Sequence, residues 1–397
     1  MRWASAVSEE RDFEAAVAAA AADVRRDLSG GPADLVVAFV STAFASHAPR
    51  LAAALRDALP HRILLGCTAE GVIGGGHEVE HRPALALTAA QLPNVVVTPF
   101  VLAPDALPNE DAPPAAWHAA FEVAPEPAPE FIILADPFSC RADALLAGLD
   151  YAYPRSTKVG GLASAARAPG ENFLLLGATA WPAGAVGVAL TGDVRIQTVV
   201  AQGCRPIGRS LQITRCHENM LIELEGQSPL LLIRQMLDTL EARDRELAAQ
   251  NLFVGVATDT LLPSGGRGDF LIRNLIGVDA ERGILAVGER LREGQTVQFH
   301  VRDARTSGED LAQHLDRFRA APQAASARGA LLFSCLGRGA HLYGAPDHDT
   351  DLFRERLGAL PLGGFFCNGE IGPVAGTTRL HGYTSSFGIF SPAAAFR

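Results

Sequence analysis

Two glycine-rich turns in this sequence carry a cysteine and a glutamate at the same spacing. The stretch from residue 63 reads ILLGCTAEGVIGGG, and the stretch from residue 361 reads PLGGFFCNGEIGPVAG. In each, an apolar run is followed by a cysteine, two small or polar residues, a glutamate and further glycines. This echo pairs Cys67 with Cys367 and Glu70 with Glu370.

The two glutamates are candidates for contact with a ligand. A strand that enters a glycine-rich turn exposes backbone N–H groups, and ligands of α/β proteins gather beyond the carboxyl ends of strands. We therefore expect Glu370, its neighbour Asn368 and Glu70 to contact a ligand, the two glutamates through an amine or guanidinium group. In the alternative interpretation, both glutamates only cap local backbone and the glycines only permit tight turns.

Two arginines stand at places where they could contact an anion. Arg338 follows Gly337 at the end of an apolar run, where backbone and guanidinium can approach a carboxylate or phosphate together; a solvated arginine in a flexible turn is the alternative. Arg273 and Asn274 interrupt the apolar run FLIRNLIG. Because buried polar groups need partners, this pair either completes a core network or lines a cavity.

Two enzymatic interpretations compete with ligand binding. Cys335 or Cys367 could act as a thiolate with His341 or His381 as its base. Cysteines in strands more often pack as small hydrophobic residues, and no G-x-S-x-G sequence is present. The H-E-x-x-H match at residues 77–81 lies between three glycines and an Arg-Pro pair, which leaves no room for the helix that a zinc site of this type requires.

Composition and charge narrow the classes of function. The 397 residues are 48% hydrophobic and 20% charged, as in a well-packed globular protein. The formal net charge is −10 and no block of basic residues occurs, which argues against nucleic acid as a partner. Lys158 is the only lysine, so a P-loop or a Schiff base would depend on that residue.

The lack of a recognisable targeting signal and the pattern of cysteines indicate the cellular compartment. The first residues lack the apolar core of a signal peptide, and no apolar run approaches the roughly 18 residues of a membrane span. The six cysteines form no C-x-x-C pair. We expect a cytoplasmic protein with reduced thiols, no membrane insertion, no metal and no cofactor.

The same order of elements recurs along the chain. Apolar strands, amphipathic helices and glycine-rich turns follow one another from the N-terminus, again from Val95 and again from Thr296, which predicts three copies of one unit. The turn of copy two, GGLAS from residue 160, has no carboxylate, so a site would not be equivalent in all copies. Residues 197–295 alternate apolar and polar residues like half-exposed antiparallel strands, with one helix expected from Pro229 to Leu247.

This pattern predicts an α/β fold. Repeated strand–helix–strand–helix–strand–strand units should form layered sheets covered by helices, with a more antiparallel central insert. We expect two domains, at residues 1–196 and 197–397.

Several of these motifs resemble the FIST family, which is named for F-box and intracellular signal transduction proteins. LVVAFVSTAF, LLGCTAEGVIGG and VGGLAS are similar to its N-terminal domain, and FLIRNLIGVDAERGILAVGERLREGQTVQFHVRD, GALLFSCLGRG and GFFCNGEIGPVAG to its C-terminal domain. The resemblance implies an intracellular sensory module that binds a small ligand, with amino acids as candidates. Family members often adjoin kinase, chemotaxis-receptor or cyclic-dinucleotide output domains, whereas these two domains occupy this whole chain, so signalling would need a separate partner protein.

The hypothesis from the sequence is therefore a cytoplasmic, non-enzymatic sensor of a small molecule. An amino acid would suit a site that offers both a carboxylate and an arginine, because its two ends carry opposite charges. Two alternatives stay open: a thiol-dependent enzyme that uses Cys335 or Cys367, and a scaffold that binds protein through a sheet edge or an apolar surface.

Overall fold

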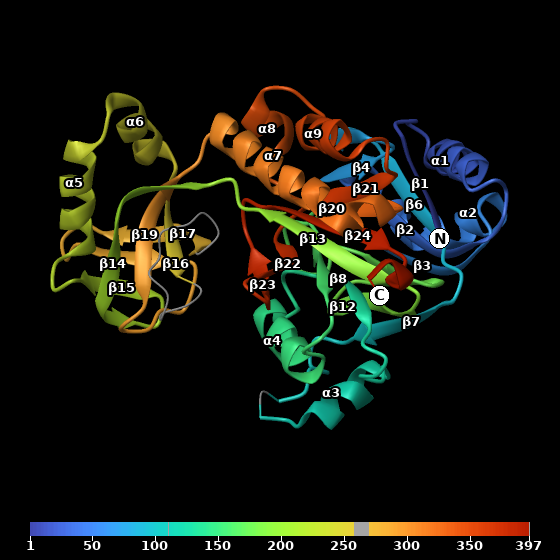
Figure 1. Cartoon of the computed structure of the whole chain (residues 1–397), viewed down its shortest axis with the longest axis horizontal. Helices are drawn as coiled ribbons and strands as arrows, with labels where there is room; N and C mark the ends of the chain where they lie inside the picture. The colour runs from blue at the N-terminus through green and yellow to red at the C-terminus, as the bar shows by residue number, and fades with distance from the viewer. Residues whose placement is uncertain (110, 258–269, 397) are drawn as a thin grey trace. The chain divides into compact units, whose positions relative to one another are not determined.

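The computed structural model describes residues 1–109, 111–257 and 270–396. Within these residues the chain forms three six-stranded sheets and one closed six-stranded barrel (Figure 1). It divides into two compact units that interleave along the chain. The first comprises Met1–Ala201, Leu311–Leu380 and the residues from Thr384 onward, and the second comprises Gln202–Asp310 with His381–Tyr383.

The first copy of the repeated unit begins with a strand and a helix that has charged side chains at both ends. Asp12 caps the first helix by accepting a 2.9 Å hydrogen bond from the backbone N–H of Ala15, and Arg25 and Arg26 lie in the last turn, where the helix dipole favours cations. Its elements are β1 (Arg2–Ser8), α1 (Phe13–Asp27), β2 (Ala33–Ser41), η1 (Thr42–Arg50), α2 (Leu51–Ala58), β3 (His61–Ala69), β4 (Gly71–Gly74), β5 (His77–Glu80) and β6 (Leu85–Gln91).

The second and third copies repeat this order. Copy two consists of β7 (Val95–Leu102), α3 (Pro114–Phe121), β8 (Glu130–Ala135), α4 (Ala142–Ala152), β9 (Lys158–Leu162), β10 (Leu174–Leu176), β11 (Thr179–Trp181) and β12 (Ala185–Gly192). Copy three consists of β13 (Arg195–Ala201), α7 (Ala304–Ala320), η2 (Pro322–Ser326), β20 (Gly329–Cys335), α8 (Gly339–Tyr343), α9 (His348–Leu357), β21 (Leu362–Cys367), β22 (Glu370–Val374), β23 (Thr377–His381), β24 (Ser385–Ser391) and η3 (Ala393–Phe396).

The three copies share one strand order. Their four main strands lie in the orders β1-β6-β2-β3, β7-β12-β8-β9 and β13-β24-β20-β21. In each, the last two strands of the order, such as β2 and β3, are parallel and the other pairs are antiparallel. The prediction of a repeated α/β unit is confirmed.

A hairpin from each copy completes the sheet of another copy. The hairpin β4–β5 of copy one pairs with β21 of copy three, β10–β11 of copy two with β3 of copy one, and β22–β23 of copy three with β9 of copy two. The exchange therefore closes a ring of three copies. Each parallel edge strand is covered by a hairpin from elsewhere in the sequence, which removes its unpaired backbone groups.

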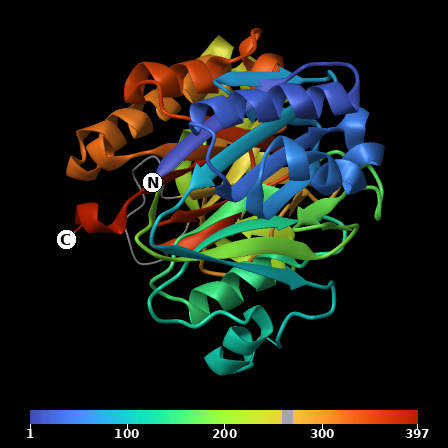
Figure 2. The same ribbon diagram turned by 90° about the vertical axis from the view of Figure 1, so that its right-hand side faces the viewer.

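The sheets share one core on their inner faces, and the helices cover their outer faces. The central core joins side chains from all three copies, among them Phe39, Ile132 and Phe365. Each sheet also packs against its own helices, and one further hydrophobic cluster fills each of these three interfaces. Figure 2 shows the helices of the first compact unit on the outside, in blue, teal and orange, with the strands between them.

The second compact unit is built on the barrel, in the order β14-β15-β18-β17-β16-β19. The predicted antiparallel insert is thereby confirmed, but two sequence predictions about it are wrong. The stretch from Thr296 is not the first strand of copy three, because it pairs with β14 and β16 inside the barrel, and β13 takes that role. The bounds are β14 (Arg205–His217), β15 (Met220–Leu224), α5 (Pro229–Thr239), α6 (Ala242–Gln250), β16 (Leu252–Ala257), β17 (Phe270–Asp279), β18 (Ile284–Val287) and β19 (Thr296–Val301).

The second wrong prediction is the single helix from Pro229 to Leu247. Leu240 and Glu241 have extended backbone, with ψ of 149° and 155°, and they separate α5 from α6. Both helices pack on the barrel core, so apolar residues keep a helical spacing across the break. The sequence pattern therefore does not reveal where α5 ends and α6 begins. Among the described residues, no helix is long and apolar enough to cross a membrane.

Candidate functional site

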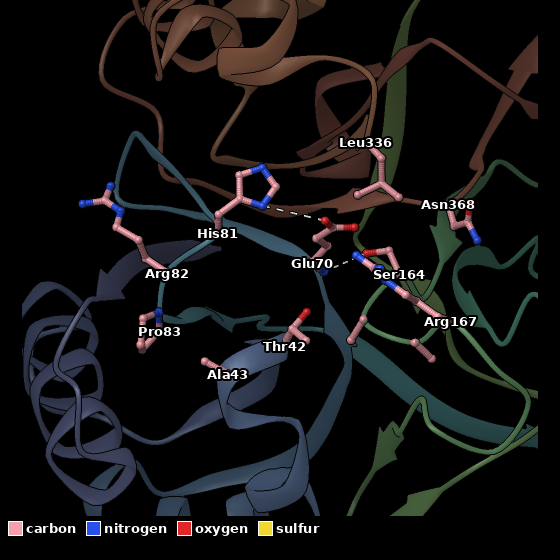
Figure 3. Close-up of a pocket in the computed structure, with 12 residues that line it drawn as sticks. Thr42, Ala43, Glu70, His81, Arg82, Pro83, Ser164, Arg167, Leu336 and Asn368 are labelled. Carbon is pink, nitrogen blue, oxygen red and sulfur yellow. Dashed lines mark hydrogen bonds and ion pairs between the residues drawn. The ribbon is translucent and has the colours of Figure 1, made fainter.

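A pocket of about 300 Å³ lies at the carboxyl ends of β2, β3, β9, β20 and β21, within the first compact unit (Figure 3). Residues from all three copies therefore surround one cavity, at the ends of parallel strands where α/β proteins bind ligands. The lining residues are Thr42, Ala43, Glu70, His81, Arg82, Pro83, Ser164, Ala165, Ala166, Arg167, Leu336 and Asn368.

Three glycines fix the correspondence between the copies. A Cβ atom at Gly66, Gly160 or Gly364 would lie 2.1, 1.8 or 1.9 Å from a carbonyl oxygen of the neighbouring parallel strand. Such distances allow only glycine, so these residues occupy one structural position in the three copies. Four residues beyond them stand the equivalent pocket residues Glu70, Ser164 and Asn368.

This correspondence corrects the pairing of Glu70 with Glu370. In the exchanged hairpins, Val72 lies opposite Phe365 and Glu370 lies opposite Gly161. Phe365 and Gly161 each follow the shared glycine by one residue, so Glu370 corresponds to Val72. Cys67 and Cys367 are thus not equivalent, because Cys367 stands two residues further beyond the shared glycine than Cys67 does. A shift of two keeps side chains on the same face of a strand, which is why both cysteines still point into the central core.

Hydrogen bonds between the copies form the floor of the pocket. The backbone N–H of Glu70 donates to the hydroxyl oxygen of Ser164 at 3.0 Å, and that hydroxyl donates to the carbonyl oxygen of Phe366 at 2.5 Å. The N–H of Asn368 donates to the carbonyl of Leu162 at 3.1 Å. All three copies are therefore joined directly beneath the pocket, so its base is fixed before a ligand arrives.

The walls of the pocket carry both signs of charge. The Glu70 carboxylate is 39% exposed and faces His81, whose Nδ1 lies 3.7 Å from it. Arg82 pairs at 2.7 Å with Glu9. The guanidinium of Arg167 is exposed and has no ion pair or hydrogen bond among the residues that the structure describes. Figure 3 shows Glu70 between His81 on one side and Arg167 on the other.

Comparison with known proteins agrees with this architecture. The FIST N domain matches residues 34–227 and the FIST C domain matches residues 230–373. The chain belongs to the FIST family. FIST domains are associated with sensory roles in signal transduction.

Relatives of this FIST protein that align with nearly all of the given chain include two mycobacterial proteins. The chain is 36% identical over 390 residues to the uncharacterized protein Rv0628c of Mycobacterium tuberculosis, covering 98% of this chain and 100% of the relative. It is 34% identical over 390 residues to the uncharacterized protein Mb0898c of Mycobacterium bovis, covering 98% and 99%. A shorter likeness, 30% over 95 residues, covers 23% of this chain and 18% of an F-box/LRR-repeat protein, At5g63520, of Arabidopsis thaliana.

Two of the residues singled out from the FIST sequence, Glu70 and Asn368, line the pocket, and Glu370 lies elsewhere. Its side chain is fully buried, and one carboxylate oxygen accepts a 3.1 Å hydrogen bond from the N–H of Thr384. This contact joins Glu370 to a backbone amide 14 residues further along the chain. The Glu370 side chain therefore lies in the protein interior, in contact with the segment between β23 and β24.

Arg338 is enclosed in the protein. Its side chain is 0% exposed, and its guanidinium donates two hydrogen bonds to Asp349, at 2.8 and 3.1 Å, and one to the Tyr343 hydroxyl at 2.5 Å. Burial alone would raise the pKa of Asp349, but the adjacent guanidinium holds that pKa well below its usual range. Gly337 donates its N–H to the sulfur of Cys335 at 3.5 Å. Among the described residues these contacts make Arg338 part of a buried network.

Arg273 and Asn274 belong to the second compact unit, on β17. The Arg273 guanidinium pairs with Glu289, and the Asn274 side-chain oxygen accepts a hydrogen bond from the Tyr383 hydroxyl. The polar interruption of this apolar strand is thus satisfied by partners within the same unit.

The candidate thiols differ in exposure. Cys367 is fully buried, and burial raises the pKa of its thiol well above the ordinary value, which disfavours a thiolate. Cys335 is half-buried at the end of β20. The H-E-x-x-H residues lie on strand β5 and the residue after it, and the residues that the structure describes contain no cluster of ligands suited to a metal.

Sequence reasoning missed several pocket residues. Ser164 is not among the predicted site residues, because the turn of copy two has no carboxylate, although it occupies the position of Glu70. The shared glycines carried the signal, since aligning the copies on them brings Ser164 and Asn368 beside Glu70. Arg167 and His81 gave no such signal, because they lie in loops that differ in length between copies.

Proposed function

We propose that this FIST protein is a sensory protein that binds a small zwitterionic molecule of the amino-acid class in the pocket at the strand ends. The single observation that carries the proposal is the pairing of charges on its walls. A partly exposed carboxylate, Glu70, and a guanidinium with no described partner, Arg167, line the same cavity. A ligand with an ammonium and a carboxylate group complements both.

The size and the walls of the pocket favour a small ligand. About 300 Å³ lies at the lower end of the range for small-molecule sites. Glu70 would accept hydrogen bonds from the ammonium group, and Arg167 would hold the carboxylate through two parallel N–H donors. Asn368 and Thr42, which also line the cavity, would fix the orientation of the bound molecule. The hydrogen-bonded floor limits the ordering cost of binding.

The family relationship supports the sensory role. Because FIST domains are associated with signal transduction, ligand binding in this chain would report to a separate signalling partner protein. We place the protein in the cytoplasm, where free amino acids are present for it to sense and where its cysteines, all unpaired in the described structure, stay reduced.

A thermal-shift screen tests this proposal. The standard L-amino acids would be added to the wild-type protein and to Glu70→Gln and Arg167→Met. A ligand at a hundred times its dissociation constant stabilises the folded protein by about 2.7 kcal/mol, which raises the melting temperature. We expect at least one amino acid to do so in the wild type, and both substitutions to reduce the shift at the same ligand concentration.

Matched substitutions outside the pocket serve as controls. Glu10→Gln and Arg11→Met change exposed side chains that do not line the cavity, and they should leave the shift unchanged. The proposal is contradicted if no amino acid stabilises the wild type, or if the pocket substitutions and the controls give the same shift.

A further inference from the structure

One hairpin joins pocket residues that lie eleven positions apart in the sequence. Glu70 directly precedes β4, and His81 and Arg82 directly follow β5. Both strands of this hairpin are carried onto the sheet of copy three, where β4 pairs with β21. The backbone of His81 is in the left-handed region, with φ of 55°, a conformation that costs free energy in a residue with a Cβ atom. The position of these pocket residues therefore depends on what holds β5 in place.

Acidic side chains hold β5 against the helices of copy three. One oxygen of Glu78 accepts a 2.9 Å hydrogen bond from the N–H of Thr350 in the first turn of α9. The N–H of Glu78 donates in return to Asp347 at 2.6 Å. Glu80 accepts a 2.8 Å hydrogen bond from the N–H of Ala340 in α8. These contacts fasten the strand that ends at the pocket to two helices of another copy.

The second carboxyl oxygen of Glu78 has an unusual environment. The side chain is 3% exposed, and Oε2 has no hydrogen-bond partner among the residues that the structure describes. The carboxyl groups of Asp349, Asp347 and Glu80 interact electrostatically with the Glu78 carboxyl. An ionised Glu78 would place a fourth negative charge there, with one oxygen unsolvated.

The nearby cations are already engaged with other acids. Arg338 and His348 contact Asp349, and His77 contacts Asp347. No titratable side chain comes from β4, whose sequence is GVIG. The charged and titratable groups nearest to Glu78 in sequence and contact are Asp347, His348 and Asp349 at the start of α9, Arg338, His341 and Tyr343 at α8, and His77 and Glu80 on its own strand. Further along α9 stand Asp351, Arg354, Glu355 and Arg356, of which Arg354 pairs with Asp351 at 2.5 Å.

Burial and these acids favour the neutral form of the Glu78 carboxyl. Burial, followed by the charges of Asp349 and Asp347, raises the pKa of Glu78 to about 8. A neutral carboxyl keeps one oxygen as the acceptor for the Thr350 N–H and removes the repulsion from its neighbours. It is therefore the form compatible with the contacts around it.

We propose that the protonated side chain of Glu78 is a positioning group for the ligand pocket, because it holds β5 on α9 and thereby fixes His81 and Arg82. As a statement about the pocket, this inference rests on the proposed function. Loss of the proton should loosen the hairpin first. Glutamine has nearly the shape of the protonated carboxyl and cannot ionise, so Glu78→Gln should preserve the position at every pH, whereas Glu78→Ala should lose it.

Hydrogen exchange of the ligand-free protein tests the positioning role directly. Amides of residues 71–80 would be followed in the wild type, Glu78→Gln and Glu78→Ala between about pH 5 and about pH 8. Relative to Glu78→Gln at the same pH, exchange in the wild type should accelerate by up to about tenfold per pH unit, because opening releases one proton. Glu78→Ala should exchange fast throughout.

The hairpin β22–β23 provides an internal control. It is fastened in the same manner, through two hydrogen bonds from Thr378 to Asp150 at 2.6 and 2.7 Å, but without Glu78. Its exchange should not distinguish the wild type from Glu78→Gln. The same pH dependence of residues 71–80 in the wild type and in Glu78→Gln would overturn the proposal.

A binding measurement separates this inference from the proposed function. Each L-amino acid that stabilises the wild type would be titrated into the three proteins at neutral pH. Binding to Glu78→Gln with wild-type affinity and at least tenfold weaker binding to Glu78→Ala would support the positioning role. Equal binding to all three would overturn it and leave the proposed function standing. If no amino acid binds the wild type, the proposed function fails, and with it the link to the pocket, while hydrogen exchange still decides whether Glu78 fastens the hairpin.

Discussion

The backbone N–H of Glu70 donates a 3.0 Å hydrogen bond to the hydroxyl oxygen of Ser164. These residues hold equivalent positions in copies one and two, and the same hydroxyl donates to Phe366 in copy three at 2.5 Å. One buried hydroxyl therefore links the three copies directly beneath the pocket. The candidate site is thus a product of the repeat, since no single copy could form it.

Replacing Ser164 by alanine should destabilise the first compact unit by about 1–3 kcal/mol, because the N–H of Glu70 and the carbonyl of Phe366 would each lose a partner. Urea unfolding followed by tryptophan fluorescence measures this change. All three tryptophans, Trp3, Trp117 and Trp181, lie in that unit and report on its unfolding. The exposed Ser46→Ala is the control and should change stability by less than about 0.5 kcal/mol. A similar small change for Ser164→Ala would show that the link is dispensable.

Breaking the buried ion pair of Arg338 and Asp349 should lower the free energy of unfolding more than the Ser164 substitution does. Arg338→Met leaves the Asp349 carboxylate buried without its cation, for which about 3–5 kcal/mol is expected. The same fluorescence-detected unfolding applies. Arg50→Met removes an exposed pair with Glu14 and should cost no more than about 1 kcal/mol. Equal effects of the two substitutions would mean that the buried arginine is solvated in solution.

Stability should depend on pH through Glu78. Its pKa in the folded protein is raised to about 8 from an ordinary value of 4.5. The stability that it contributes is therefore fully present below the ordinary value and is lost as pH rises through about 8, by at most about 1.4 kcal/mol per pH unit. Measured against Glu78→Gln, the free energy of unfolding of the wild type should fall across this window and level off above it. A difference that is constant with pH would contradict the raised pKa.

Thiol labelling discriminates the remaining enzymatic alternative. Cys67 and Cys367 are fully buried with pKa values raised by burial, so iodoacetamide should label them in the native protein only as fast as the protein opens. Mass spectrometry of time points at neutral pH measures each cysteine separately. Fast, selective labelling of Cys335 would favour a reactive thiol at that position. Fast labelling of Cys367 would contradict the buried site described here.

The fold was largely predictable because its repeat leaves a periodic pattern. Apolar runs such as ADLVVAFVS and EFIILA are buried on both faces, and such runs identify strands covered by helices. The exchange of hairpins was not predictable. Strand pairing between β4 and β21 joins residues almost three hundred positions apart, and nothing in a local pattern specifies such a partner. The same limit explains why the strand from Thr296 was assigned to the wrong layer.

The site was predicted in part, for a physical reason. Glu70 and Asn368 were found because polar residues after buried strands mark the carboxyl ends of a sheet. Arg338 has the same kind of sequence context, yet its partner Asp349 comes from a separate helix and encloses it. Sequence context places a residue at a strand end, but the neighbouring copy decides whether that end is open or covered.

The most direct test of the account is calorimetric titration of one stabilising L-amino acid and its N-acetylated analogue into the wild type and Glu70→Gln. Acetylation removes the positive charge that Glu70 is proposed to bind. In the wild type it should weaken binding by about 1.5–3 kcal/mol, the contribution of a hydrogen bond to a charged group, and in Glu70→Gln it should change binding little. Equal losses in the two proteins, or no binding of any amino acid to the wild type, would contradict the assignment of this pocket to a zwitterionic ligand.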